Sequence, residues 1–410
     1  MIKIVDLDSG VRLVLEKLDH VKSVATGIWV KTGAVNEVEQ HSGISHFVEH
    51  MMFNGTETMT GRELAEAVDA IGGQSNAFTS KEMTCYFIKT MDTAMIDGAK
   101  ILVDMVENSI FLEKEMDKER KVIAEEIKMT LDTPDDLVIE NITEAVFSHM
   151  NLGKSIIGTP ETLEAITRDV MVDYVANHYT RDSIVVSVAG NFDENQVIEF
   201  YNGAFKNLKS GQKKRPEVNG IFKPDASTEI MDIKQSHIAL GIPGLSSLDE
   251  RRFALSILMN VMGGSMSSRL FQSIREQQAL AYSVYGSTTF YIDGGITTIY
   301  AGVAHDKTEQ AVNAIIEELR KLKRDGITKE ELESSKTQLK SNLVFYNENV
   351  STRMLANGKS LLTRGAALEM DQLVEGYDKV TMEDIDNIKE LITDESKYCW
   401  RGVSNDTINF

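Results

Sequence analysis

Residues 42–56 read Ser-Gly-Ile-Ser-His-Phe-Val-Glu-His-Met-Met-Phe-Asn-Gly-Thr and form the strongest chemical pattern in the chain. Their apolar residues recur at helical spacing, so we predict a helix over residues 43–53. At about 100° per residue, His46, Glu49 and His50 fall on one face of this helix. Two neutral imidazoles one turn apart can bind one zinc ion, and a carboxylate beside them can take a proton from water. The stretch therefore indicates a hydrolase, although histidines at this spacing can also be simply solvated on a helix surface.

A catalytic zinc ion needs a third protein ligand and one open position. The best candidates lie in a predicted helix over residues 112–130, which contains Glu119, Glu125 and Glu126. Glu119 and Glu126 share one face, so one could bind the metal while the other supports a ligating histidine. Glu125 points about 100° away and is the weaker candidate. In an acidic chain, these carboxylates could equally form a solvated helix surface.

The sequence resembles the pitrilysin and insulinase type of zinc metallopeptidase, the inverzincins, and especially the processing-peptidase branch that includes the β subunit of the mitochondrial processing peptidase. The family motif SG-x-x-H-F-x-E-H-M-x-F-x-G-T matches residues 42–56, and its V-I-x-x-E segment matches residues 122–126. The resemblance implies one zinc ion per chain, bound by His46, His50 and Glu126. It also implies that Glu49 is the general base and that Glu119 supports a ligating histidine.

Two further matches imply how a substrate is held. Residues 72–82 resemble the family strand whose exposed edge pairs with an extended peptide, which implies that Asn76 and Ala77 bind substrate. An ordinary edge strand is about equally compatible with these residues. Residues 267–284 resemble the family's R-x6-Y segment, which implies that Arg275 and Tyr282 contact substrate and assist the developing oxyanion. Without the resemblance, they would be interpreted as a surface arginine and a half-buried tyrosine.

The order of local patterns predicts an α+β fold. Alternation around Ser9-Gly10 predicts a hairpin of residues 2–7 and 11–15, which a β-rich run over 23–31 follows. Helical spacing predicts further helices over 62–71 and 93–109, and residues 76–89 are strand-like.

The second half of the chain repeats the pattern of the first. Residues 23–28 align with 236–242, and residues 111–116 align with 327–332. Apolar periodicity lapses around residues 206–227, where Gly, Lys and Pro accumulate. We therefore predict two tandem homologous domains, each a mostly antiparallel sheet packed against helices. These are a zinc-binding domain over 1–207, a linker over 208–227 and a domain without metal over 228–410, which contributes substrate contacts.

Composition excludes several classes of function. The chain has 410 residues, of which 42% are hydrophobic, so it is long enough for more than one globular domain. Its 43 basic and 63 acidic residues give a net charge of −20, which argues against a nucleic-acid partner. Cys85 and Cys399 are isolated, which argues against a disulfide framework. With neither a signal-peptide pattern nor an apolar run of about 18 residues, we expect a cytoplasmic protein without a membrane partner.

The sequence predicts a zinc endopeptidase that hydrolyses unfolded peptides or short protein segments bound extended in an enclosed chamber. The resemblance implies that one chain forms half of a clamshell chamber and that two chains form a homodimer, in which Arg275 and Tyr282 act on the partner's zinc site. The alternative is a noncatalytic scaffold or assembly subunit of the same architecture. Such relatives typically lack an intact motif, which this chain retains.

Overall fold

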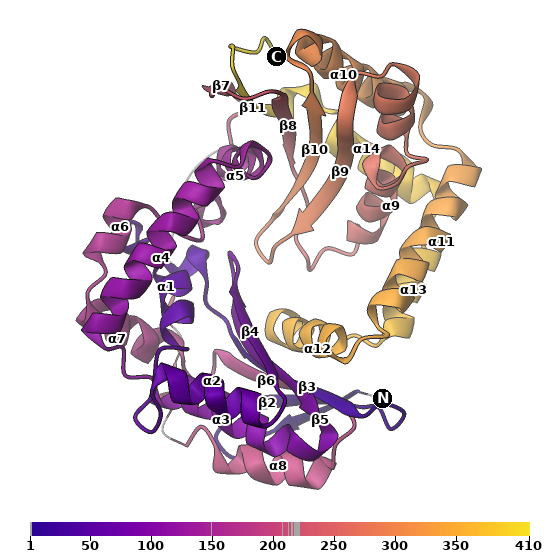
Figure 1. The fold of residues 1–410 in the computed structure, drawn as a ribbon. Helices are drawn as coiled ribbons and strands as arrows, with labels where there is room; N and C mark the ends of the chain where they lie inside the picture. The colour runs from indigo at the N-terminus through magenta and orange to yellow at the C-terminus, as the bar shows by residue number, and fades with distance from the viewer. Residues whose placement is uncertain (1, 149, 207, 212, 215, 217–221) are drawn as a thin grey trace. The chain divides into compact units, whose positions relative to one another are not determined.

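The computed structural model describes residues 2–148, 150–206, 208–211, 213–214, 216 and 222–410. Its contacts divide the chain into two compact units (Figure 1). The first unit comprises residues 1–127, 154–217 and 344–369, and the second comprises 128–153, 218–343 and 370–410. Each unit has one mostly antiparallel sheet with helices packed against it, so the predicted α+β fold with two domains is confirmed. Residues 212, 215 and 217–221 of the predicted linker lie outside the described residues.

The sheet of the first unit has six strands in the order β1-β2-β6-β3-β5-β4. The strands are β1 (Ile2–Asp6), β2 (Arg12–Lys17), β3 (Ser23–Val30), β4 (Gln74–Thr79), β5 (Thr84–Met91) and β6 (Ile184–Gly190). Only β2 and β6 pair in parallel among these neighbours. Strands β1 and β2 form the predicted hairpin. The strand-like residues 76–89 are instead two antiparallel strands, β4 and β5.

Both faces of this first sheet are covered. The helices before β7 that belong to this unit are α1 (Ile44–Met51), α2 (Gly61–Ala70), α3 (Met95–Asn108), α4 (Glu113–Leu131), α6 (Pro160–Ala165), α7 (Arg168–His178) and α8 (Glu194–Gly203). Helix α12 (Val350–Arg364), which comes from the second half of the chain, packs against the face of the sheet opposite to these helices. Gly27 allows this close packing, because a Cβ atom there would lie 2.4 Å from the sulfur of Met354.

The sheet of the second unit has five strands in the order β7-β11-β8-β10-β9. The strands are β7 (Ala226–Ile230), β8 (Ser236–Pro243), β9 (Ala281–Phe290), β10 (Gly295–Val303) and β11 (Cys399–Ser404). Its helices include α9 (Arg252–Gly263), α10 (Thr308–Asp325), α11 (Lys329–Tyr346), α13 (Met370–Asp378) and α14 (Met382–Thr393). Helices α9, α10 and α14 contribute apolar residues to one core with β8 and β10.

Helix α5 (Pro134–Val146) comes from the first half of the chain but packs on β8 and β11 of the second sheet. Gly241 allows this packing, because a Cβ atom there would lie 2.5 Å from the side chain of Ile142. Gly27 lies in the repeated segment 23–28 and Gly241 in the segment 236–242 that aligns with it. Each sheet therefore receives one helix from the other half of the chain, and each helix packs at a glycine.

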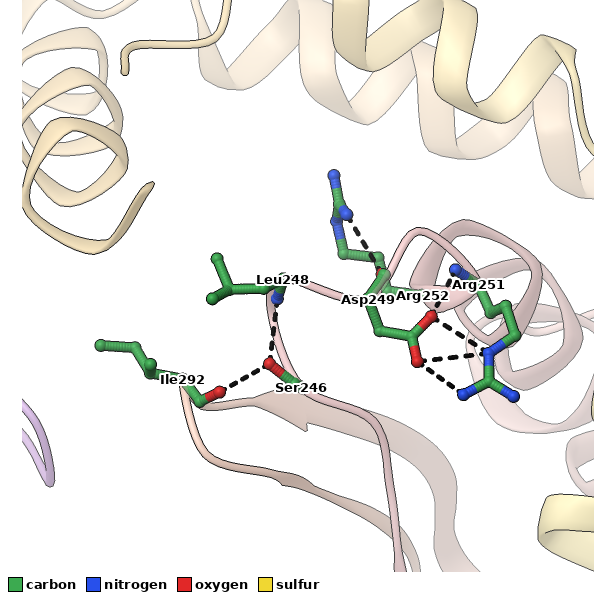
Figure 2. Close-up of polar contacts among 6 residues, drawn as sticks. All are labelled: Ser246, Leu248, Asp249, Arg251, Arg252 and Ile292. Atoms are coloured by element: carbon green, nitrogen blue, oxygen red, sulfur yellow. Dashed lines mark hydrogen bonds and ion pairs between the residues drawn. The ribbon is translucent and has the colours of Figure 1, made fainter. Parts of the chain in front are cut away.

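Figure 2 shows how the segment before α9 is fixed within the second unit. The hydroxyl of Ser246 donates to the carbonyl oxygen of Ile292 at 2.6 Å, which ties the loop after β8 to the turn between β9 and β10. The Asp249 carboxylate accepts from the backbone N–H and side chain of Arg251, which holds the pKa of that carboxyl below its usual range. Among the described residues, no helix has both the length and the apolar character needed to cross a membrane.

Candidate active site

Helix α1 carries His46, Glu49 and His50 and lies beside β4 and α7 in the first unit. Helix α1 begins after Gly43, whose φ of 91° is favourable only for glycine, and it ends at Met51. Its apolar residues Ile44, Phe47, Val48 and Met51 are buried in the core. This apolar anchoring fixes the direction in which the polar face of the helix points.

A buried carboxylate braces the start of α1. Glu37 is 1% exposed and accepts hydrogen bonds from the backbone N–H groups of Gly43 (2.7 Å) and Ser45 (2.9 Å). Burial raises the pKa of Glu37 in spite of these bonds. The Tyr174 hydroxyl adds a second brace, because it lies 2.7 Å from the hydroxyls of both Ser45 and Thr32. Sequence reasoning missed both groups, since neither lies at a recognisable motif position.

Three donor atoms meet at the polar face of α1. The Nε2 atoms of His46 and His50 are 3.3 Å apart, and each lies 3.7 Å from an Oε2 atom of Glu126 on α4. These three residues are the group of described residues that could hold a metal ion. The point in the plane of the three atoms that is equidistant from them lies about 2.1 Å from each. This distance is within the range of about 2.0–2.2 Å for zinc bonded to nitrogen or oxygen. The cluster therefore fits a zinc ion in size and in donor type.

The second ring nitrogens of the two histidines have different surroundings. His50 Nδ1 lies 3.0 Å from a carboxylate oxygen of Glu119, which is about two turns before Glu126 on the same face of α4. This contact favours a proton on Nδ1 and leaves Nε2 with a free lone pair for a metal. His46 Nδ1 is buried and has no hydrogen-bond partner among the residues that the structure describes. Burial and the neighbouring His50 lower the pKa of His46 to about 4, so its imidazole is neutral, as a ligand must be, at ordinary pH.

Glu49 lies beside the three donors but is held from a different element. Its carboxylate accepts a hydrogen bond of 2.5 Å from the hydroxyl of Thr79, the last residue of β4. Burial raises the pKa of Glu49, whereas the Thr79 hydrogen bond and the charge of His50 lower it. Thr79 is a contact that sequence reasoning missed, because no local pattern links a strand end to a helix thirty residues earlier.

The predicted substrate-pairing residues lie on the same strand. β4 is the last strand of the first sheet, and Asn76 is exposed on it. The Asn76 side-chain oxygen accepts from the N–H of Ala77 at 2.8 Å. This edge of the sheet therefore lies next to the base-bearing helix α1, which contacts β4.

Arg275 and Tyr282 lie in the second unit. Arg275 is in the π-helix Phe271–Gln277, and its guanidinium lies over the ring of Phe271, 4.7 Å from the centroid. Tyr282 is the second residue of the edge strand β9 and is 67% exposed. The structure thus groups His46, Glu49, His50, Glu119 and Glu126 in one site of the first unit, whereas it places Arg275 and Tyr282 on the other unit.

Comparisons with known proteins agree with this geometry. Residues 12–160 match the family described as insulinase (peptidase family M16), and residues 165–339 match the peptidase M16 inactive domain. A Bacillus subtilis protein named uncharacterized zinc protease YmxG is 41% identical over 402 residues, which cover 96% of this chain and 97% of that protein.

Solved structures share the fold. A protease from Helicobacter pylori superposes with a TM-score of 0.91 at 22% identity and covers 98% of this chain and 99% of its own. A chain of complex III2 from Candida albicans superposes with a TM-score of 0.83 at 17% identity, covering 99% of this chain and 96% of its own. The same fold therefore occurs in a chain described as a protease and in a chain of complex III2.

Proposed function

Because the chain belongs to the insulinase family of peptidases, M16, we propose that it is a zinc-dependent endopeptidase that hydrolyses unfolded peptides or short protein segments. The observation that carries the proposal is the spacing of the three donor atoms of His46, His50 and Glu126. Two imidazoles and one carboxylate are a donor set of catalytic zinc sites, which keep one coordination position open. A bound zinc ion would supply Lewis-acid chemistry, lowering the pKa of water and polarising the scissile carbonyl.

Glu49 acts as the general base in this proposal. Its carboxylate is beside the donor cluster on the same helix but is not one of the three donors. It takes a proton from the attacking water and returns it to the leaving amine. Glu119 holds the His50 ring through Nδ1, so that Nε2 faces the cluster.

The edge of β4 binds the substrate as an added strand. Main-chain hydrogen bonds between the peptide and this edge, where Asn76 and Ala77 lie, hold the peptide extended and with little dependence on its sequence. The Asn76 side chain now accepts from the Ala77 N–H, so a peptide carbonyl that pairs there takes its place. Folded proteins cannot present such a strand, and we therefore expect them to be poor substrates.

Arg275 and Tyr282 complete the proposal by stabilising the negative charge that develops on the scissile carbonyl oxygen. The exposure of Tyr282 and the position of Arg275 on a π-helix, a geometry frequent at functional sites, support this role. We propose a homodimer in which these two residues act on the partner's zinc site. Cys85 and Cys399 are both buried free thiols, which is consistent with the proposed cytoplasmic location.

A noncatalytic scaffold subunit is the competing proposal. The fold alone would permit it, since a chain of complex III2 from Candida albicans has the same fold. However, a noncatalytic scaffold would not require three donor atoms at zinc spacing, a histidine whose ring is held by a carboxylate, and an additional glutamate beside them. The intact donor set therefore favours the peptidase.

The test is turnover of a quenched-fluorescent peptide library by the parent protein and by Glu49→Gln. We expect Glu49→Gln to retain about one zinc ion per chain but to lose about 10²–10⁴-fold in kcat, because an amide cannot accept the proton. Removing metal from the parent with a chelator should abolish cleavage, and adding zinc should restore it.

Glu199→Gln is the matched control, because it makes the same chemical change at an exposed position on α8. It should behave as the parent. Undiminished cleavage by Glu49→Gln would refute the assigned base, and zinc binding without cleavage by the parent would favour the scaffold.

A further inference from the structure

The Glu49 carboxylate is held by a hydrogen bond from the end of β4. Among the described residues, the Thr79 hydroxyl is its only hydrogen-bond partner. A glutamate side chain has three rotatable bonds, so an unrestrained carboxylate would occupy several rotamers. A base must lie within hydrogen-bond reach of the proton that it takes, so the position of this carboxylate matters.

Thr79 itself is held rigidly. It ends β4 and pairs with Thr84 of β5, whose hydroxyl donates to the carbonyl oxygen of Thr32 at 3.0 Å. The turn that follows is closed by a hydrogen bond of 2.8 Å from the Ser80 N–H to the Met83 carbonyl. Because Thr is β-branched, its χ1 angle is also restricted. The hydroxyl is therefore a fixed donor on the sheet, not a mobile surface group.

The turn after Thr79 also contacts the loop that follows β3. The N–H of Val35 donates to the carbonyl oxygen of Lys81 at 2.9 Å. A Cβ atom at Gly33 would lie 2.2 Å from the carbonyl oxygen of Ser80, so the two loops are in close backbone contact. These contacts fix the end of β4 independently of α1, and the hydrogen bond to Glu49 transmits that position to the base.

We propose that Thr79 is a positioning residue, which holds the Glu49 carboxylate in the one orientation suited to proton transfer. This inference rests on the proposed function, because it gives Thr79 a role in the same reaction. It gives β4 two roles: the strand edge at Asn76 and Ala77 binds the peptide, whereas the Thr79 side chain orients the base. Loss of the hydroxyl should therefore affect kcat and leave peptide binding largely intact.

The kinetic test compares Thr79→Val with Thr79→Ser. Valine has nearly the shape of threonine but no hydroxyl, whereas serine keeps the hydroxyl and loses only a methyl group. We expect Thr79→Val to lower kcat about ten- to a hundredfold with KM within about twofold of the parent. We expect Thr79→Ser to recover kcat to within about threefold of the parent. If Thr79 had a purely structural role, both variants would have a lower folded fraction. The loss of activity would then not depend on whether residue 79 carries a hydroxyl.

Thr363→Val is the matched control, because it removes a hydroxyl whose hydrogen bond stays within helix α12. It should leave kcat unchanged. Equal kcat values for Thr79→Val and the parent would overturn the inference while the proposed function stands. Loss of zinc binding or of thermal stability in Thr79→Val, matched in Thr79→Ser, would also overturn it in favour of a structural role.

A crystallographic test does not depend on activity. In the structure of Thr79→Ser, the Glu49 carboxylate should stay within hydrogen-bond distance of residue 79. In Thr79→Val, we expect it to leave that position or to occupy more than one conformer. A single unchanged Glu49 conformer in Thr79→Val would show that another group positions the base, and would overturn the inference even if the parent cleaved no peptide in the library.

Discussion

Glu119 and Glu126 occur on one helix but contact the two histidines differently. Glu126 places an oxygen at equal distances from both Nε2 atoms, whereas Glu119 reaches only His50 Nδ1. Within the described part of the chain, His46 Nδ1 has no hydrogen-bond partner and is instead buried. Only one of the two rings is therefore oriented by a carboxylate, so the orientation of His50 depends on Glu119 in a way that the orientation of His46 does not.

We predict that Glu119→Ala lowers zinc affinity about 10–100-fold, because His50 loses the acceptor that fixes its tautomer and ring orientation. Glu119→Gln should lose less, since its amide oxygen can still accept from Nδ1. The measurement is the zinc dissociation constant from competition with a chromophoric chelator. Glu125→Gln is the control, because Glu125 is an exposed carboxylate on the same helix. Equal zinc affinity for Glu119→Ala and Glu125→Gln would contradict the prediction.

Part of this site could be predicted because three of its residues are close together in the sequence. His46, Glu49 and His50 share a helix, and their common face follows from helix geometry alone. The choice among Glu119, Glu125 and Glu126 depends on how α4 packs beside α1, so the residues left it open and only the resemblance indicated Glu126. Thr79 and Glu37 act through tertiary contacts at unremarkable positions, and no local pattern singles them out.

At the scale of elements, helical periodicity located the helices near the site well. The predicted ranges 43–53, 62–71 and 112–130 correspond to α1, α2 and α4. The prediction of one strand-like stretch over residues 76–89 was wrong in one respect, because a turn divides it into two strands. That turn reads Ser-Lys-Glu-Met and has no Gly, Pro or Asn; the Ser80 hydroxyl closes it by donating to the Met83 carbonyl. A turn made by a serine side chain inside a β-rich run gives little sequence signal.

Helix α12 is bound to the first sheet by a buried charge, and this gives a second prediction. Glu16 on β2 is 8% exposed and accepts from the side chains of Arg353 and Asn357 on α12. We expect Glu16→Gln to lower the free energy of unfolding by about 2–3 kcal/mol, because Arg353 loses its partner away from bulk water. Urea unfolding measures the loss, and hydrogen exchange in α12 shows where it occurs.

An exposed ion pair in the same unit supplies the comparison. Glu66→Gln removes the partner of Arg62 at the surface of α2 and should cost less than about 0.5 kcal/mol. If both glutamine variants lose the same free energy of unfolding, the buried pair does not hold α12 in place.

At the scale of the whole molecule, the sequence predicts the family and the two-domain α+β fold correctly, and both are confirmed. The internal repeat makes this possible, because two copies of one pattern indicate two copies of one fold. The pattern does not indicate that α5 and α12 pack on sheets of the opposite half. The apolar face of an amphipathic helix shows that the helix is buried, but not which sheet buries it.

The final prediction concerns which chain supplies Arg275 to a given zinc site. In the proposed homodimer, it comes from the partner, so a chain with His46→Ala and a chain with Arg275→Ala complement each other. Random pairing puts half of the chains in mixed dimers, and each mixed dimer has one of its two sites intact. An equal mixture that exchanges subunits should therefore recover about a quarter of the parent activity.

Coexpression with two affinity tags, followed by peptide turnover of the doubly tagged dimer, measures this complementation directly. A doubly tagged dimer without activity would mean that Arg275 acts within its own chain, whereas an active Arg275→Ala homodimer would mean that Arg275 is not needed. The double variant Arg275→Ala with His46→Ala in one chain, paired with a parent chain, gives the converse test. If Arg275 acts within its own chain, that dimer keeps half of the parent activity; if it acts across the dimer, both sites lack one group and activity is lost.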